Sequence, residues 1–303
     1  MSKRMIAIIA GISVVVIAAV VVLIIVLSGG NSYRLLKMYE FNGTGSVTRE
    51  GKGEMTPYTN MVLESGDKIA LDTGRLVIQA DEDKYIHLDE HTEIKLVATG
   101  KSDNSKTEIE LIKGGISNDI RNKLSAQSSY EINTPNSTMS VRGTVFYAYI
   151  YELDGIKYTR VCVFEGTVAT RLVYKDGTVD TMEVAVGKGK EIIIYEDGTT
   201  TDYLYDEPQD IDYDTLPENV LLDLKNMIDV DGKTLSITSP EITRILEGPY
   251  YVTFMYGDKE FGTQTVKKGE KAVVPSLRPA AAGGWDFDFG SAIEHDTKIE
   301  WKQ

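Results

Sequence analysis

The sequence is poor in the residues that build disulfide frameworks and most metal centres. Its 303 residues include one cysteine and three histidines. A single cysteine excludes an internal disulfide framework and every zinc site built from several cysteines. Positive charge is also scarce: 32 lysines and arginines stand against 46 aspartates and glutamates, a formal net charge of −14. Nucleic-acid binding needs clustered positive charge, so we expect no nucleic-acid partner.

What the sequence does contain is typical of a folded, strand-rich protein. Apolar residues make up 42% and charged residues 26%, unlike the composition of a disordered chain. The length is typical of about two domains. There are 17 tyrosines against 7 phenylalanines and 2 tryptophans. Because tyrosine favours strands and half-exposed surfaces, this composition favours β structure.

An uncharged apolar run at residues 5–27 directly follows Lys3 and Arg4. A helix over this run would span roughly 34 Å at about 1.5 Å per residue, enough to cross a membrane. The sequence therefore predicts a single transmembrane helix over 5–27 that contacts the lipid bilayer. The positive charges favour residues 1–4 in the cytoplasm and 28–303 outside it, in a single-pass cell-membrane protein. The alternative is a cleaved signal peptide, whose apolar run is usually about 7–15 residues.

From residue 52 to 195 the sequence alternates between short apolar runs and turn residues. Runs such as 76–80, 85–88 and 94–97 are bounded by Asp, Gly and Thr, which indicates strands and turns. Asp-Gly pairs suit type I′ hairpin turns, because both central residues of that turn need positive φ. They occur at 154–155, 176–177 and 197–198. The pattern predicts an all-β sandwich, roll or solenoid.

Changes in composition divide the chain into successive segments. We expect a juxtamembrane segment at 28–57, a larger β domain at 58–195, an acidic linker at 196–248 and a small β domain at 249–303. Within the linker, Thr215 to Glu218 forms a capping-box pattern before apolar residues at helical spacing, which predicts a helix over 216–228. The small domain must rely on an aromatic core, expected from Phe254, Trp285, Phe287 and Trp301.

Two patterns resemble metal sites, but the residues around each pattern do not fit the site that it resembles. His87 to His91 matches the H-x-x-E-H signature of zinc peptidases, which needs both histidines on one helical face. Here the histidines fall in a strand and a turn, where four extended residues span roughly 13 Å. Asp210 to Asp214 resembles the start of a calcium loop, but Thr215 replaces its glycine and Leu221 its final glutamate. We therefore predict no metal site and interpret the acidic stretch as a solvated linker.

The remaining reactive or charged features also have structural explanations. Cys162 lies between apolar residues on both sides, which predicts a buried and inert thiol. Gly187 to Lys190 lacks the spacing of a phosphate-binding loop and is predicted to be a turn. For Arg142 we favour a structural role in which a buried or half-buried guanidinium is paired, with contact to an anion or ligand as the alternative. No nucleophile and base stand out, so we predict a non-enzyme without cofactor, and the binding residues stay unassigned.

The segment from about Tyr58 to Tyr195 resembles the FecR domain of bacterial regulators of the iron-dicitrate type. The strongest stretch is Tyr130–Phe146, with a Thr-Pro step, an alternating strand and Val-Arg-Gly-Thr before an aromatic residue. Leu88–Ile94, Leu111–Ile116 and Val161–Val168 match in the expected order. This resemblance implies an extracytoplasmic all-β domain. Residues 1–4 are too few to form the cytoplasmic surface with which the classical regulators contact a sigma factor.

The C-terminal segment is similar to the internalin-type B-repeat of bacterial surface proteins. Three short stretches carry this resemblance, Tyr251–Phe254, Trp285–Phe289 and Ile299–Trp301. The predicted fold class is thus an all-β ectodomain, a FecR-like β roll or solenoid plus a small B-repeat-like domain, on a single N-terminal transmembrane helix.

The predicted function is a non-catalytic binding, sensing or scaffold module at the cell envelope, with an envelope protein or a glycan as its candidate partner. The alternative is a FecR-type signal-transduction regulator that acts through a partner membrane protein.

Overall fold

The computed structural model of this protein describes residues 34–101, 104–196 and 202–303. Its secondary structure is dominated by strands, as the sequence predicted. The transmembrane part of the predicted fold class needs correction. The predicted span at 5–27 lies outside the described residues, and none of the helices within them combines the length and apolarity needed to cross a membrane. The fold class is therefore corrected to all-β with short helices.

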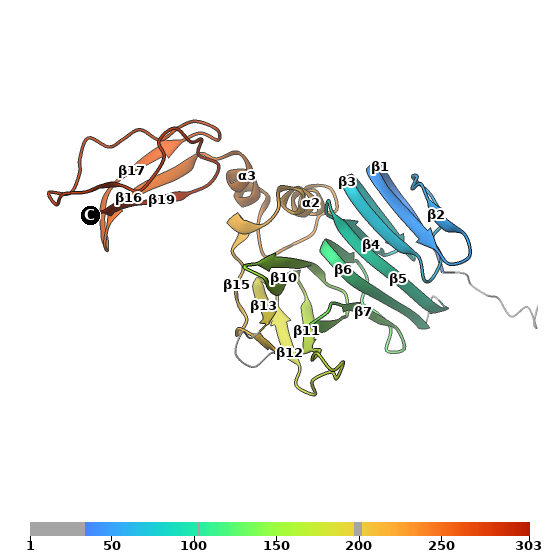
Figure 1. The fold of residues 1–303 in the computed structure, drawn as a ribbon. Helices are drawn as coiled ribbons and strands as arrows, with labels where there is room; N and C mark the ends of the chain where they lie inside the picture. The colour runs from blue at the N-terminus through green and yellow to red at the C-terminus, as the bar shows by residue number, and fades with distance from the viewer. Residues whose placement is uncertain (1–33, 102–103, 197–201) are drawn as a thin grey trace, which may run out of the picture.

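Most of the described strands belong to one 15-stranded sheet (Figure 1). Its first part consists of β1 (Leu36–Arg49), β2 (Gly53–Met55), β3 (Lys68–Ala80), β4 (Lys84–Leu88), β5 (Thr92–Lys101) and β6 (Asn104–Ile120). The second part consists of β7 (Ser129–Asn133), β8 (Ser137–Val141), β9 (Val145–Leu153), β10 (Ile156–Glu165), β11 (Thr167–Leu172), β12 (Val184–Gly187), β13 (Lys190–Glu196), β14 (Tyr203–Tyr205) and β15 (Gln209–Asp210). The runs expected at 76–80, 85–88 and 94–97 lie in β3, β4 and β5, as predicted.

The segment expected at 28–57 to be juxtamembrane contributes to this sheet. Strand β1 pairs antiparallel with β3 from Leu36 to Thr48, and β2 pairs with the end of β1. Gly43 and Gly74 are opposite each other in this pairing and both have positive φ. A Cβ atom on Gly74 would lie 2.1 Å from the carbonyl oxygen of Asn42, so the two backbones can approach only where side chains are absent.

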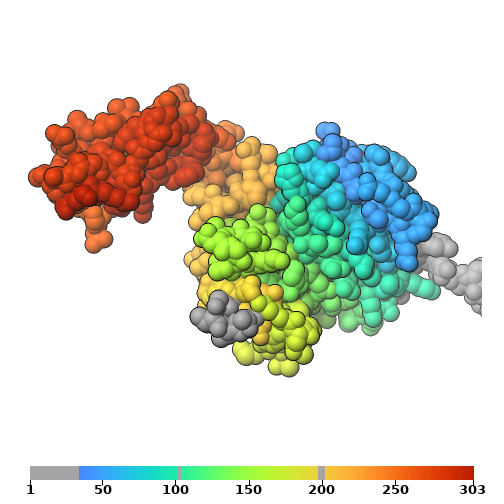
Figure 2. Space-filling model, viewed as in Figure 1, coloured from blue at the N-terminus to red at the C-terminus, as the bar shows by residue number. Residues whose placement is uncertain are grey.

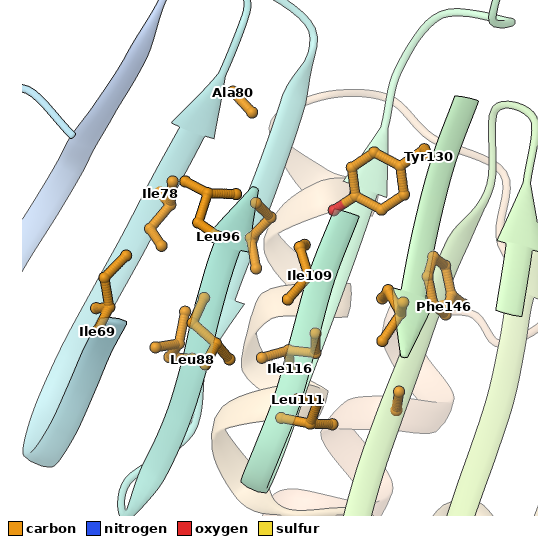
Figure 3. Packing of buried hydrophobic residues seen from close by; sticks show 14 of the residues in the cluster. Ile69, Ile78, Ala80, Leu88, Leu96, Ile109, Leu111, Ile116, Tyr130 and Phe146 are labelled. Atoms are coloured by element: carbon orange, nitrogen blue, oxygen red, sulfur yellow. The ribbon is translucent and has the colours of Figure 1, made fainter. Parts of the chain in front are cut away.

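The sheet divides at β6 into two branches that enclose the main core. The first half of β6 pairs with β7, which leads to β8, β11 and β12. The second half pairs with β9, which leads to β10 and β13. Buried side chains from both branches meet in one cluster. Figure 3 shows part of it, with Ile109, Leu111 and Ile116 of β6 beside Leu96 of β5 and Tyr130 of β7.

Strands β9 and β10 are buried on both faces. Phe146 and Ala148 of β9 point into the main core, whereas Val145 and Tyr147 join a second cluster on the opposite face. This second cluster is closed by helices α2 (Glu218–Asp229) and α3 (Ser239–Glu247), which lie against that face in Figure 1. Burial on both sides accounts for the continuous apolar sequence of these strands. Asp154 and Gly155 join them with φ values of 52° and 78°, which confirms the expected type I′ turn.

The other two Asp-Gly pairs give different outcomes. Gly177 has φ of 84°, but Asp176 is not among the residues with positive φ, so this turn is not type I′. Instead, the Asp176 carboxylate accepts a hydrogen bond from the backbone N–H of Thr178. The pair at 197–198 lies outside the described residues.

The segment predicted to be an acidic linker packs against the large sheet. Helix α2 begins at Glu218, and its N-cap residue Pro217 makes no side-chain cap hydrogen bond, so the capping box expected at Thr215 to Glu218 does not form. A capping box does form at helix α3, between Thr238 and Glu241. Strands β14 and β15 pair with β13. Within its described residues, the predicted acidic linker therefore contributes strands to the large sheet and a helix to its second core.

The C-terminal residues form a separate four-stranded sheet that projects from the main body (Figure 2). Its strands are β16 (Tyr250–Tyr256), β17 (Lys259–Val266), β18 (Gly284–Trp285) and β19 (Thr297–Lys302), and β16 pairs in parallel with β19. The expected aromatic core is confirmed. The ring of Trp285 lies 5.1 Å from those of both Phe254 and Trp301, and Phe287 packs against the same cluster.

Candidate binding groove

A ladder of five tyrosines crosses the outer face of the branch formed by β9, β10 and β13. Tyr147, Tyr149 and Tyr151 alternate along β9, so all three point to the same face. Their neighbouring ring centroids are 6.0 Å and 5.5 Å apart, with interplanar angles of 13° and 14°. Tyr158 of β10 stacks on Tyr151 at 4.9 Å, and Tyr195 of β13 follows at 6.1 Å. We call this row the tyrosine ladder.

An arginine–glutamate pair lies next to the ladder. The Arg160 guanidinium donates from Nε and Nη2 to Oε2 of Glu191, at 2.9 Å and 2.6 Å. It also donates to Oγ1 of Thr215 and to the carbonyl oxygen of Asp212. The other carboxylate oxygen of Glu191 accepts from the side chain of Gln209. Because the two charged side chains are only 12% and 3% exposed, this network fixes the segment 209–217 beside the sheet.

Tyr147, Tyr149 and Tyr151 of the ladder and the segment 209–217 line a groove of about 780 Å³, which we call the tyrosine groove. This volume falls within the range of about 300–1,000 Å³ that is typical of ligand sites. Asp212 shapes the rim, because its carboxylate accepts from the N–H of Asp214 and so caps the 3₁₀ turn η1 (Tyr213–Thr215). Pro217 closes the groove where helix α2 begins.

The charges that line the tyrosine groove are mostly negative. Its lining residues include the acidic Glu152, Glu191, Asp212 and Asp214, against one basic residue, Arg160. Glu191 is paired with Arg160. Glu152 and Asp212 have no ion pair within the described residues, and the nearest cation to Asp214 is the guanidinium of Arg244, at 3.9 Å. The groove therefore offers unneutralised acceptors at its rim.

Helix α2 covers the first tyrosine of the ladder and leaves the next ones open. Tyr147 is 1% exposed, and its hydroxyl donates to Oδ2 of Asp89 at 2.6 Å. The other oxygen of this carboxylate accepts from Nδ2 of Asn219, on α2, at 2.5 Å. Burial raises the pKa of Asp89, because these two neutral donors do not offset the loss of water. Tyr149 and Tyr151 are half-buried.

A second carboxylate anchors α2 by charge. Asp223 is 5% exposed, and its two oxygens lie 2.7 Å from Nη1 of Arg75 and 2.9 Å from Nδ1 of His87. Burial alone would raise the pKa of Asp223, but the hydrogen bonds and charges of His87 and Arg75 outweigh it and lower that pKa. Arg75 also pairs with Glu40 at 3.1 Å. These contacts join helix α2 to strands β3 and β4.

The patterns that resemble metal sites lie where their context predicted. His87 belongs to strand β4, whereas His91 lies in the following turn with φ of 61°. His87 contacts Asp223, so the zinc-peptidase pattern is divided between a strand and a turn. Within the residues that the structure describes, no group of three His, Cys, Asp or Glu side chains is arranged to hold a metal ion. The acidic stretch at 210–214 instead forms the rim of the tyrosine groove.

The other singled-out residues give mixed outcomes. Cys162 is fully buried, as predicted, and its thiol donates to Oε2 of Glu191 at 3.4 Å. Burial raises the pKa of this thiol, which keeps it protonated. Residues 188 and 189 form a turn between β12 and β13, as predicted. Arg142 was expected to be paired and at least half-buried, but it is exposed because strand β8 ends at Val141.

Sequence reasoning missed the tyrosine groove. One signal was available, since Tyr147, Tyr149 and Tyr151 alternate within a short stretch of the sequence. Nothing in the local pattern indicated that residues 209–217 would return to this face. The groove depends on that return, and on Arg160 that holds the returning segment.

Comparisons with known proteins match part of the chain. Residues 67–169 match the family model described as FecR protein, which covers about a third of the 303 residues, from β3 into β11. The match includes the first part of the ladder and Arg160, but neither Glu191 nor the segment 209–217. No curated protein matches the chain. Residues 249–303 also lie outside the family match, so their resemblance to a B-repeat stays a prediction.

Two solved structures are similar over most of the chain. Both are described as "a putative anti-sigma factor from Parabacteroides distasonis ATCC 8503", at 1.65 Å and 2.50 Å resolution. They share 14% and 13% sequence identity with this chain and have TM-scores of 0.37 and 0.38. Each match covers 78% of this chain and 98% of the other.

Proposed function

We propose that this chain is a FecR-type regulator of signal transduction that senses a ligand or partner by binding it, without catalysing a reaction. The observation that carries the proposal is the FecR match at 67–169, which includes β9 and β10, two of the three strands that line the tyrosine groove. The groove supplies a concave site of ligand size on this domain. Sensing requires such a site, because a ligand can shift an equilibrium only through differential contacts.

The chemistry of the groove supports binding over catalysis. The one thiol, Cys162, is buried and held protonated, so it does not offer a nucleophile. Glu191 is committed to Arg160 and Gln209. The tyrosine rings offer contact area and hydroxyl groups, which serve recognition.

We further propose that the β domains lie outside the cytoplasm, at the cell envelope, and that the signal passes through a partner protein there. This location follows the FecR resemblance. Protease treatment of intact cells tests it, with detection of the C-terminal sheet by an antibody. We expect digestion at the cell surface or in spheroplasts without lysis, and protection until lysis would contradict this location.

The regulatory role is tested by deletion and complementation in the native host. Transcription should change when the gene is deleted and recover with the unchanged chain. Complementation with Tyr151→Ala, in the groove, should leave the deletion phenotype. The matched control is Tyr58→Ala, because Tyr58 is 61% exposed and does not line the groove, and it should restore transcription. Unchanged transcription on deletion, with altered attachment or envelope integrity, would instead favour the scaffold function.

A further inference from the structure

We infer that the tyrosine groove binds an extended, positively charged peptide segment of a partner protein. This inference rests on the proposed function, because it names the ligand of the same groove. It follows from which hydrogen-bonding groups of the groove are already used, which are free, and which ring surfaces remain accessible.

The cationic donor of the groove is already occupied. Arg160 is its one cation, and its guanidinium donates to Glu191, to Oγ1 of Thr215 and to the carbonyl oxygen of Asp212. An incoming carboxylate or phosphate would find no free cation and would meet the acidic rim residues Asp212 and Asp214. Anionic ligands are therefore disfavoured by charge and by the lack of an unpaired cation.

Acceptor groups of the groove, in contrast, still have unused capacity. Among the described residues, the carboxylate of Asp212 has no ion pair and accepts from the backbone N–H of Asp214, and the carboxylate of Asp214 has only the long contact to Arg244. The hydroxyl groups of Tyr149 and Tyr151 likewise form no hydrogen bond within this part of the chain. A ligand that donates several hydrogen bonds and carries positive charge would satisfy these groups. Lysine and arginine side chains have both properties.

The ring surfaces argue against a sugar as the ligand. Sugar binding on aromatic side chains uses an exposed ring face. Tyr149 lies between Tyr147 and Tyr151, and Tyr151 lies between Tyr149 and Tyr158, so neighbouring rings cover both faces of each. What these two tyrosines present to the groove is their edges and hydroxyl groups. The rings also repeat every second residue along β9, and an extended peptide places alternate side chains on one side with about the same repeat, near 6.6 Å.

The binding test uses the full chain and synthetic peptides as probes. The probe is a fluorescent hexapeptide with lysine at alternate positions and serine between, and its partner has glutamate in place of lysine. Fluorescence anisotropy gives the dissociation constants at low and high salt. We expect the lysine peptide to bind, the glutamate peptide not to bind, and the affinity to fall as salt rises. A tetrasaccharide of N-acetylglucosamine, added as competitor, represents the glycan alternative.

Variants separate this groove from the general acidity of the chain. Asp212→Asn with Asp214→Asn should weaken binding about threefold to tenfold, since two exposed charge contacts are lost. The matched control, Glu50→Gln with Glu54→Gln, removes the same charge from exposed positions outside the groove and should leave the affinity unchanged. Tyr149→Phe with Tyr151→Phe keeps the stacked rings but removes the hydroxyl groups, and should also weaken binding.

Three results would overturn the inference: equal binding of the two peptides, equal losses in the groove and control variants, or competition by the tetrasaccharide without binding of the lysine peptide. These failures are distinguishable from failure of the proposed function. If transcription still depends on Tyr151 in cells, the regulatory proposal stands while the peptide inference fails.

Discussion

The anchor of helix α2 gives the sharpest prediction for stability. Asp223→Asn keeps the shape of the side chain but removes its charge, which Arg75 and His87 contact at 2.7 Å and 2.9 Å. Breaking a buried charge pair by removing one partner typically costs about 3–5 kcal/mol. Here the loss is smaller, because the Arg75 side chain is 38% exposed and keeps its contact with Glu40. We expect Asp223→Asn to lower the free energy of unfolding by about 2 kcal/mol.

The two sheets can be followed separately, which makes this loss measurable. Both tryptophans, Trp285 and Trp301, lie in the C-terminal sheet, whereas the tyrosine ladder lies in the larger unit. Tryptophan fluorescence therefore reports on the C-terminal sheet, and near-ultraviolet circular dichroism of tyrosine reports mainly on the larger unit. A loss of about 2 kcal/mol should lower the Tm of the larger unit by about 4–8 °C. The tryptophan transition should stay in place.

Asp89→Asn is the matched control on the same face. In this variant the new amide can donate to the hydroxyl of Tyr147, while its oxygen still accepts from Asn219, so both present partners stay satisfied. The change also removes a carboxylate whose charged form is disfavoured by burial. We therefore expect a change below about 1 kcal/mol at neutral pH. If Asp223→Asn destabilises the larger unit no more than Asp89→Asn, charge anchoring of α2 is refuted.

The pH dependence of the two carboxylates should have opposite signs. The folded pKa of Asp223 is lowered, so its stabilising contribution is present above the usual pKa near 3.8 and is lost as pH falls through the lower folded pKa. The folded pKa of Asp89 is raised, so stability decreases as pH rises from about 3.8 through the higher folded value. In Asp89→Asn, the decrease in stability with rising pH should be absent. In Asp223→Asn, the loss of stability relative to the unchanged chain should disappear at low pH, where Asp223 is protonated. Denaturant unfolding at several pH values measures both.

Three further predictions concern positions outside this anchor. Gly74→Ala should cost more than about 2 kcal/mol in denaturant unfolding, because its Cβ would lie 2.1 Å from the carbonyl oxygen of Asn42 at a positive φ; a change below about 0.5 kcal/mol would contradict this close approach. Cys162 should resist alkylation by a maleimide until the larger unit unfolds, and rapid labelling of the native chain would contradict its burial. Thr238→Ala should cost about 1 kcal/mol, because it removes the capping box of α3, whereas Thr215→Ala should leave α2 uncapped as it already is. Helix content, followed by circular dichroism during unfolding, distinguishes the two threonine variants. Equal effects of the two variants on helix content would contradict the prediction that only Thr238 caps a helix.

Strand positions could be predicted from the sequence, but the segment that covers the second face of the sheet could not. The runs at 76–80, 85–88 and 94–97 lie on strands because their alternation matches the period of two. In β9 this alternation is hidden. Phe146 faces the main core and Tyr147 faces the helices, so both parities are apolar or aromatic. A single sequence shows that such a strand is buried on both faces, but not which later segment covers the outer one.

The two capping-box patterns show how tertiary contacts decide between equal local signals. Thr215 to Glu218 and Thr238 to Glu241 share the same spacing, yet only the second forms the box. The hydroxyl of Thr215 accepts from Arg160 and donates to the carbonyl oxygen of Asp212. It is therefore engaged in the wall of the groove and unavailable to cap α2. Local propensity predicts that a helix starts near Thr215. What Thr215 contacts is determined by Arg160, which lies 55 positions earlier in the chain.

The tyrosine groove exists because the helical cover of the outer face ends part of the way along the ladder. Asn219, in the first turn of α2, covers Tyr147 through Asp89, but the preceding Pro217 is extended, so the helix begins only at Glu218. The next rungs, Tyr149 and Tyr151, are left half-buried at that point. The start of α2 therefore sets one end of the groove. The contacts that hold α2 against the sheet also set the width of the groove. A ligand that presses on Pro217 would act on the helix that Asp223 holds against β3 and β4, which gives binding in the groove a physical route to the rest of the domain.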